Sequence, residues 1–359
     1  MDRKAGLDVV RTAAISFVLL RHWWVAIEGY GPTSSILGNI AANGWLGVDI
    51  FFALSGFLVS RSFWTKNDAR EFLVHRIARI VPAYFFCLLV IFAAPGVFMG
   101  DPAGASALEI VEHLFFLNDY TGSELIVAFW TLAVEMKFYV VAAGVFVILR
   151  GRKPTTIALV LAGLAFASIA ARALEAAMLG DGIDYLLYFH NLRSPMHVSL
   201  DPLFLGASAG VLTLARTPSQ SLSTAMVWAG TLGLFTLLAS KQWMVVPGVM
   251  EVAAVPGAAG IFAALLVAGA AQSRSMPASR GFKRAAELTF AVYLVHMSTI
   301  PWAKGVMEFF QGSELAFTLF YLCATLMLAA ILHAVIEQPA RRYLLNRFST
   351  SPQRMAAGS

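Results

Sequence analysis

Long apolar runs separated by short polar segments dominate the chain. Ten of them approach the length of a membrane-spanning helix, which needs about 20 apolar residues to cross the hydrocarbon core. They cover residues 7–29, 44–64, 77–99, 128–149, 155–177, 197–215, 222–239, 245–271, 286–303 and 315–337. A further apolar stretch at 107–118 is too short to cross and suits a re-entrant or interfacial segment. The pattern predicts an all-α, polytopic membrane helix bundle of about ten transmembrane helices.

Composition agrees with a membrane protein. Hydrophobic residues make up 58% of the 359 residues and charged residues 13%, whereas soluble domains carry about 25% charged residues. The two cysteines, Cys87 and Cys323, lie in apolar segments and form neither a disulfide framework nor a metal-binding spacing, so no metal site is predicted. The first apolar run starts near Leu7 without a small-residue cleavage site, which predicts a retained first span.

Lysine and arginine are unevenly distributed among the loops. If the N-terminus is cytosolic, most of them fall in inner segments, and the outer loops keep only Arg172, Arg193, Lys241 and Lys304. We therefore interpret the net charge of +5 as a topology signal and expect no nucleic-acid partner. The distribution predicts cytosolic termini, a transmembrane domain over residues 1–345 and a disordered cytosolic tail over 346–359.

The first apolar run contains two ionisable residues, Arg11 and His22. Their separation is close to three helical turns, so both side chains lie on one helix face, roughly 16 Å apart along the axis. Such groups in a membrane helix are costly and usually face a bundle interior or a wet cavity. A snorkelling arginine and a hydrogen-bonded core histidine would also fit this spacing.

Several motifs follow one another along the chain. In order they read GLDVVRTAAISFVLLRHWW, GWLGVDIFFALSGFLVSRSFW, FLVHRIARIVPAYF, FWTLAVEMKFYVV, AVYLVH and EQPARR, and they extend from about Leu7 to Arg342. Together they resemble the acyltransferase-3 family of membrane enzymes. The resemblance implies transfer of acyl groups, commonly acetyl from acetyl-CoA, to sugar hydroxyls of surface polysaccharides, lipopolysaccharide and related acceptors. It also implies a bacterial inner membrane, and acetyl-CoA as a co-substrate rather than a permanently bound cofactor.

Two positions depart from the family pattern. Met136 and Lys137 follow Glu135 where a second carboxylate is common, so a paired-carboxylate mechanism is not expected. His75 and Arg76 occupy positions where two adjacent arginines are common.

The resemblance makes His22 the candidate catalytic residue. A histidine can remove the proton from an attacking hydroxyl, because its pKa suits that task, or it can accept the acyl group itself. Asp49 and Glu135 are further catalytic candidates, since either acid could orient His22 and stabilise its charged ring. His296 is the rival histidine, and we assign it to substrate binding.

Candidate binding residues fall into two groups. Arg11, Arg76 and Arg79 sit near cytosolic helix ends and suit the phosphates of coenzyme A, although lipid headgroups would explain them too. Trp130 and Tyr139 could stack on a sugar acceptor, although aromatic residues are also common at membrane interfaces. Ser55 and Gly56 indicate close helix packing.

The predicted partners are an acyl-CoA donor, a carbohydrate acceptor and membrane lipids, and the oligomeric state stays open. A transporter or flippase with a polar pathway through the bundle is the alternative function. Inverted repeats and paired broken helices, typical of transporters, are not visible in the sequence.

Overall fold

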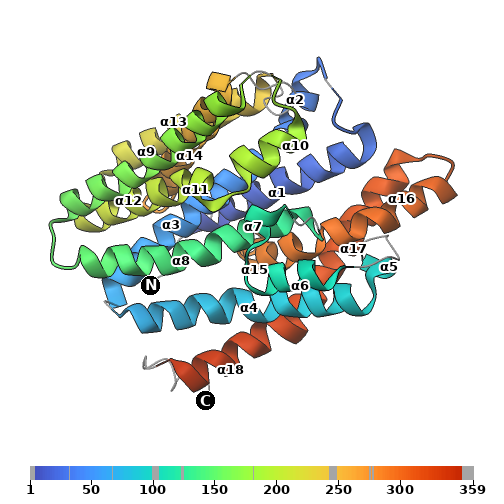
Figure 1. The fold of residues 1–359 in the computed structure, drawn as a ribbon. Coiled ribbons are helices and arrows are strands. Elements are labelled where there is room, and N and C mark those ends of the chain that lie inside the picture. Colours follow the sequence, from blue (N-terminus) through green and yellow to red (C-terminus); the bar gives the residue numbers. More distant parts are fainter. Residues whose placement is uncertain are drawn as a thin grey trace.

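The computed structural model describes residues 5–31, 33–66, 68–98, 105–122, 125–180, 182–241, 249–274, 276 and 279–349. Within these ranges the regular structure is helical and contains no strand. Figure 1 shows the long helices running beside one another in a bundle. The predicted all-α polytopic fold is confirmed.

Eight helices in the described part of the chain are long and apolar enough to cross a membrane. They are α1 (Ala5–Glu28), α3 (Leu46–Lys66), α4 (Ala69–Ala93), α8 (Trp130–Ile148, extended by η1 at Val127–Phe129), α9 (Pro154–Leu179), α13 (Gln220–Ala239), α14 (Val249–Ala270) and the continuous run of α17 (Glu314–Leu332), η4 (His333–Glu337) and α18 (Gln338–Phe348). These helices correspond to eight of the ten predicted spans.

The sixth and ninth predicted spans are shorter helices. The sixth is α12 (Asp201–Ala215), with 15 residues, and the ninth contains α15 (Arg280–Val295), with 16 residues. After α15 the chain changes to the 3₁₀ turn η3 (Met297–Thr299) and then to α16 (Ile300–Phe309). Pro301 has no N–H for a continuous helical ladder, so a break here is physically reasonable. The span predicted over 286–303 is therefore not one continuous helix.

Short helices connect the long ones. They are α2 (Ile36–Ala42), α5 (Pro95–Phe98), α6 (Ala107–Leu114), α7 (Asn118–Thr121), α10 (Tyr185–Leu187), η2 (Tyr188–Arg193) and α11 (Met196–Ser199). The apolar stretch predicted at 107–118 forms α6 and part of α7, and neither is long enough to cross a membrane.

The helix α3 lies at the centre of the bundle and packs against α1, α8, α12 and α14. Its closest approach is to α12, where both helices carry glycine. A methyl group on Gly56 would lie 1.8 Å from the Leu203 carbonyl oxygen, and one on Gly206 would lie 1.9 Å from the Ala53 carbonyl oxygen. The predicted close packing at Gly56 is thus present, because only glycine lets the two backbones come this near.

Contacts between distant segments define two ends of the bundle. At one end, Gly6 lies against Ala270, and Ser349 donates a hydrogen bond to Glu71 at 2.5 Å. This end collects the start of α1 and α4 and the end of α14 and α18, where the sequence is rich in arginine and lysine. We call it the basic end. At the opposite end, the Asn43 amide donates to the Lys241 carbonyl oxygen at 3.0 Å.

Two boundaries differ from the sequence-based prediction. The helix α4 begins at Ala69 rather than at 77, because Asp68 caps it by accepting hydrogen bonds from the Arg70 and Glu71 amides. The helix α18 continues to Phe348, past the predicted start of the tail at 346. Residues 350–359 of that tail lie outside the described residues.

Candidate functional site

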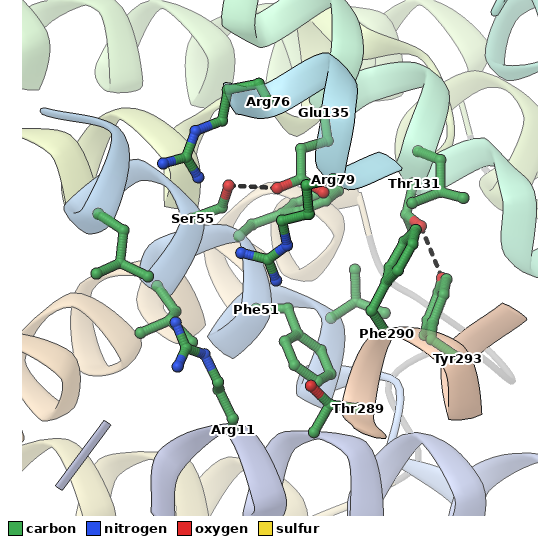
Figure 2. Close-up of a pocket in the computed structure, with 15 residues that line it drawn as sticks. Arg11, Phe51, Ser55, Arg76, Arg79, Thr131, Glu135, Thr289, Phe290 and Tyr293 are labelled. Carbon is green, nitrogen blue, oxygen red and sulfur yellow. Dashed lines mark hydrogen bonds between the residues drawn. The ribbon is translucent and has the colours of Figure 1, made fainter. Parts of the chain in front are cut away.

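An arginine-lined cavity lies among α1, α3, α4, α8 and α15. Figure 2 shows Arg11 entering it from α1 and Arg76 and Arg79 from α4, beside Ser55 and Glu135. Its lining residues are Arg11, Val48, Phe51, Phe52, Leu54, Ser55, Leu58, Arg76, Arg79, Thr131, Leu132, Glu135, Thr289, Phe290 and Tyr293. The three arginines predicted to bind the donor are therefore brought together from two separate helices. We call this space the arginine cavity.

The local sequence explains how these side chains meet. Arg76 and Arg79 are one turn apart on α4, so they share a helix face. Arg76 packs over the Phe72 and Tyr139 rings, with its guanidinium carbon 5.6 Å and 5.8 Å from their centroids. Its buried Nε atom has no hydrogen-bond partner within the described residues. A donor without a partner at a cavity wall indicates a site for an acceptor atom from a ligand.

Acidic residues also contact the arginine cavity. Glu135 accepts hydrogen bonds from the hydroxyl groups of Ser55 and Tyr139, and Figure 2 shows the Ser55 contact. Ser55 therefore points into the cavity. The sequence predicted only close helix packing for this residue. Arg11 is 3.4 Å from Asp8 on the same helix. The cavity combines cationic groups with one carboxylate fixed by hydroxyl donors.

A second cavity adjoins the first. It is lined by Val18, Arg21, His22, Trp45, Val48, Val127, Ala128, Trp130, Tyr185, Phe189, Arg193 and Tyr293. Val48 and Tyr293 line both spaces, so the cavities meet at these two side chains. We call this second space the histidine cavity.

His22, in the wall of the histidine cavity, contacts a second histidine. The His22 ring, from α1, lies 5.0 Å from the His296 ring, which follows α15. His296 is fully buried, and its Nδ1 atom lies 2.8 Å from the Tyr293 carbonyl oxygen. Because a carbonyl only accepts hydrogen bonds, Nδ1 carries the proton, and in the neutral ring Nε2 has a lone pair. That Nε2 atom has no partner among the described residues.

Asp49 forms an ion pair with Arg193 and is not hydrogen-bonded to His22. Its two carboxylate oxygens each accept a hydrogen bond from Arg193 at 2.9 Å, and both side chains are buried. The Arg193 guanidinium also lies over the Trp45 and Trp130 rings, at 4.9 Å and 5.4 Å from their centroids. In the part of the chain that the structure describes, neither Asp49 nor Glu135 is hydrogen-bonded to His22. The triad-like arrangement expected for these acids is absent from this conformation.

The two aromatic residues predicted to contact the acceptor lie in different places. Trp130 lines the histidine cavity and packs edge-on against Phe189. Tyr139 is 1% exposed and is enclosed by Phe72 and Arg76, with its hydroxyl on Glu135. Its ring has no free face for a sugar, so the structure disagrees with the expected stacking role of Tyr139.

Sequence reasoning missed Arg21, Tyr293 and Arg193 as cavity residues. Arg193 was counted only as a basic residue of an outer loop, although its buried partner Asp49 was a candidate. The adjacent Arg21 and His22 were a visible signal, since two ionisable residues in succession are rare inside an apolar run. Tyr293 carried no such signal, because its position depends on how α15 packs.

Lys137, which departs from the family pattern, forms an ion pair in the structure. Lys137 forms an ion pair with Asp119 of α7, and Asp119 also accepts a hydrogen bond from the Met196 amide at 3.1 Å. Burial raises the pKa of Asp119, although Lys137 opposes that shift. Asp119 thus connects α7 both to α8, through Lys137, and to α11, through Met196. Among the described residues, no group of three or more His, Cys, Asp or Glu side chains could hold a metal ion.

Comparison with known proteins identifies the family. The acyltransferase domain family matches residues 4–334. The chain is 36% identical to the exopolysaccharide production protein ExoZ of Rhizobium meliloti, over 30% of this chain and 36% of that protein. It is 26% identical to Nodulation protein 10 of Rhizobium leguminosarum bv. viciae, over 94% of this chain and 93% of that protein. It is also 26% identical to the O-acetyltransferase OatA of Staphylococcus aureus, over 42% of this chain.

The coverage of these relatives differs. The chain spans 36% of the length of ExoZ and 26% of the length of OatA, but nearly all of Nodulation protein 10. No solved structure matches the chain. The domain match extends over nearly the whole transmembrane bundle, including both cavities, and confirms the resemblance seen in the motifs. The chain belongs to the acyltransferase-3 family.

Proposed function

We propose that this chain is an integral membrane O-acyltransferase. It transfers an acyl group, most simply acetyl from acetyl-CoA, to a hydroxyl of a sugar in a polysaccharide or another glycosylated acceptor. The observation that carries this proposal is the meeting of two chemically different cavities at Val48 and Tyr293. One cavity offers guanidinium groups for an anionic donor, and the other has His22 in its wall for proton transfer, with the His296 ring behind it. The names of the relatives, which include an O-acetyltransferase and an exopolysaccharide production protein, support this reading.

The arginine cavity is the proposed donor site. Arg11, Arg76 and Arg79 would pair with the phosphates of acyl-CoA, because guanidinium groups bind phosphate oxygens through two parallel hydrogen bonds. The unpartnered Nε of Arg76 supports this assignment. Arg11 and His22 are roughly 16 Å apart along α1, which suits an extended pantetheine arm. The thioester would then lie near the junction of the cavities.

His22 is the proposed general base. It would take the proton of the acceptor hydroxyl while the hydroxyl oxygen attacks the thioester carbonyl carbon. The new C–O bond forms and the C–S bond breaks, and the proton passes from the imidazolium to the departing thiolate, which gives coenzyme A. The free lone pair on Nε2 of His296 makes this residue a second candidate for the same proton.

Orientation follows from the distribution of charge. The basic end of the bundle would face the cytosol under the positive-inside rule, and acyl-CoA would enter there. Membership of this family supports a bacterial inner membrane as the location. Transfer would then carry an acyl group from the arginine cavity toward the opposite side of the membrane.

Radiolabelled acetyl-CoA supplied to membrane vesicles tests the proposal. Everted vesicles expose the cytosolic face, and right-side-out vesicles do not. We expect label in the extracted glycan fraction only from everted vesicles containing this chain. Label that appears equally without the chain, or no label with either acetyl-CoA or succinyl-CoA, would contradict an acyltransferase.

Two adjoining cavities would also fit a transporter with a polar pathway, which is the second candidate. A transporter would move its substrate without consuming acyl-CoA. Uptake of labelled glycan precursor by vesicles that lack acyl-CoA distinguishes the two functions. We expect no such uptake.

A further inference from the structure

Arg21 is a buried cation in the wall of the histidine cavity. It precedes His22 on α1, and only 7% of its surface is exposed. One of its N–H groups donates to the Ala42 carbonyl oxygen at 2.9 Å, and its guanidinium carbon lies 5.4 Å from the Tyr30 ring centroid. Within the described residues, no carboxylate lies within ion-pair distance of Arg21. Its charge therefore has no anionic partner among the described residues.

The other charges of this cavity cancel. Arg193 also lines the space, but Asp49 neutralises it through two hydrogen bonds at 2.9 Å. The lining residues include no aspartate or glutamate. The histidine cavity thus keeps the positive charge of Arg21. A buried charge without a partner is costly, and an anionic ligand would remove that cost.

We propose that the histidine cavity takes an acceptor sugar that carries a carboxylate or phosphate group close to the hydroxyl to be acylated. This inference rests on the proposed acyltransferase function and specifies its acceptor. Arg21 would bind the anionic group and His22 would contact the hydroxyl, and because the two residues are consecutive, both groups must lie near each other on the acceptor. A uronic acid and a sugar phosphate both meet this condition.

The geometry leaves enough donors for such a ligand. A guanidinium has five N–H donors, and Arg21 uses one for the Ala42 carbonyl oxygen and another for the Tyr185 hydroxyl. The remaining donors can bind a carboxylate or phosphate in the usual two-bond arrangement. Trp130 and Tyr185 line the same space and provide aromatic faces for the sugar ring.

A purely structural role for Arg21 is the competing explanation. Ala42 is the last residue of α2, and a cation there would stabilise the C-terminal end of that short helix. Under this explanation, loss of Arg21 lowers stability but does not change which acceptors bind. The test must therefore measure preference between anionic and neutral sugars.

Thermal unfolding of the purified chain in detergent measures binding without catalysis. Glucuronate, glucose 6-phosphate and glucose serve as probes, and saturating coenzyme A is present throughout so that phosphate cannot act through the arginine cavity. We expect stabilisation by glucuronate or glucose 6-phosphate but not by glucose. The stabilisation should be lost in Arg21→Gln and partly kept in Arg21→Lys. The better of the two anions separates a carboxylate site from a phosphate site.

Label transfer tests the same inference during turnover. We expect the anionic sugars to compete with the native glycan for label in the wild type. In Arg21→Gln the KM for the anionic acceptor should rise by about 10- to 100-fold, as expected for a lost charge-assisted hydrogen bond. Arg152→Gln, an exposed arginine in the loop before α9, is the matched control and should behave as the wild type.

The outcomes separate this inference from the function on which it rests. If label is transferred but neutral and anionic sugars compete equally, the inference is overturned and the acyltransferase function stands. If Arg21→Gln lowers stability without changing the preference, Arg21 is structural and the inference is again overturned. If anionic sugars stabilise the chain through Arg21 but no label is transferred, the binding site stands and the proposed reaction fails.

Discussion

The His22 and His296 rings lie 5.0 Å apart, although the two residues come from opposite parts of the chain. The contact exists because the helix that begins at Arg280 breaks at His296, next to α1. Nε2 of His296 keeps its lone pair free at this position. The two residues that sequence reasoning ranked as rival histidines thus form one pair at the histidine cavity.

The arginine cavity should bind the acyl donor. Replacing Arg76 or Arg79 by alanine removes a charge-assisted contact, which is worth about 1.5–3 kcal/mol, so acyl-CoA binding should weaken by about 10- to 100-fold. Titration calorimetry in detergent measures the affinity. Arg152→Ala, at an exposed loop position, is the control and should leave it unchanged. Equal affinity in the Arg76→Ala/Arg79→Ala double variant would instead assign these arginines to lipid headgroups.

The junction between the cavities should control transfer but not donor binding. Val48 lines both spaces, so the larger side chain of Val48→Phe should obstruct a thioester that reaches from the arginine cavity toward His22. We expect label transfer to fall by at least about tenfold, since misplacing the reacting groups by 1 Å can cost that much or more. Stabilisation of the chain by acyl-CoA should persist. Val48→Ala is the matched control, and full transfer by Val48→Phe would argue against a route past this residue.

The buried Asp49–Arg193 pair should stabilise the fold through charge balance. Asp49→Asn leaves the Arg193 charge without its partner, which typically costs about 3–5 kcal/mol. Thermal unfolding in detergent should show a clear drop in Tm. The double variant Asp49→Leu/Arg193→Met removes both charges and should recover part of the loss. A double variant less stable than Asp49→Asn would show that the hydrogen bonds matter more than the charge.

Close packing between α3 and α12 depends on glycine. An alanine at Gly56 or Gly206 would place its methyl group within 2 Å of a backbone oxygen, at 1.8 Å and 1.9 Å respectively. Overpacking of this kind costs about 1–3 kcal/mol or more, so each variant should lower Tm. Gly163→Ala in α9 is the matched control, because nothing lies within 4 Å of its added methyl group. If the alanine variants at Gly56 and Gly206 unfold at the same temperature as Gly163→Ala, then α3 and α12 move apart at little cost.

The long apolar runs predicted the helices because a membrane span must satisfy its backbone internally and present apolar side chains. They did not locate the break at His296, because the apolar run extends beyond it, although Pro301 is a signal against one continuous helix. The charge pattern identified Arg11, Arg76, Arg79 and His22 as candidates, and they line two adjoining cavities.

The partners of these residues could not be predicted in the same way. Asp49 and Arg193 come from distant segments, and pairing across the bundle depends on helix packing that single-sequence patterns do not encode. The same reason applies to Tyr139, whose neighbours on α4 direct its hydroxyl to Glu135 and enclose its ring. Some residues that line the cavities could therefore be named from the sequence, whereas their contacts could not.

The most direct test of the account compares label transfer from acetyl-CoA in everted vesicles containing wild type, His22→Ala or His197→Ala. His197 lies on α11, where its side chain is 43% exposed, and it serves as a histidine control. Loss of a general base reduces rates by about 10²- to 10⁴-fold, so we expect that reduction in His22→Ala and normal transfer in His197→Ala. Normal transfer by His22→Ala at equal expression would contradict the assignment of His22 as the catalytic base.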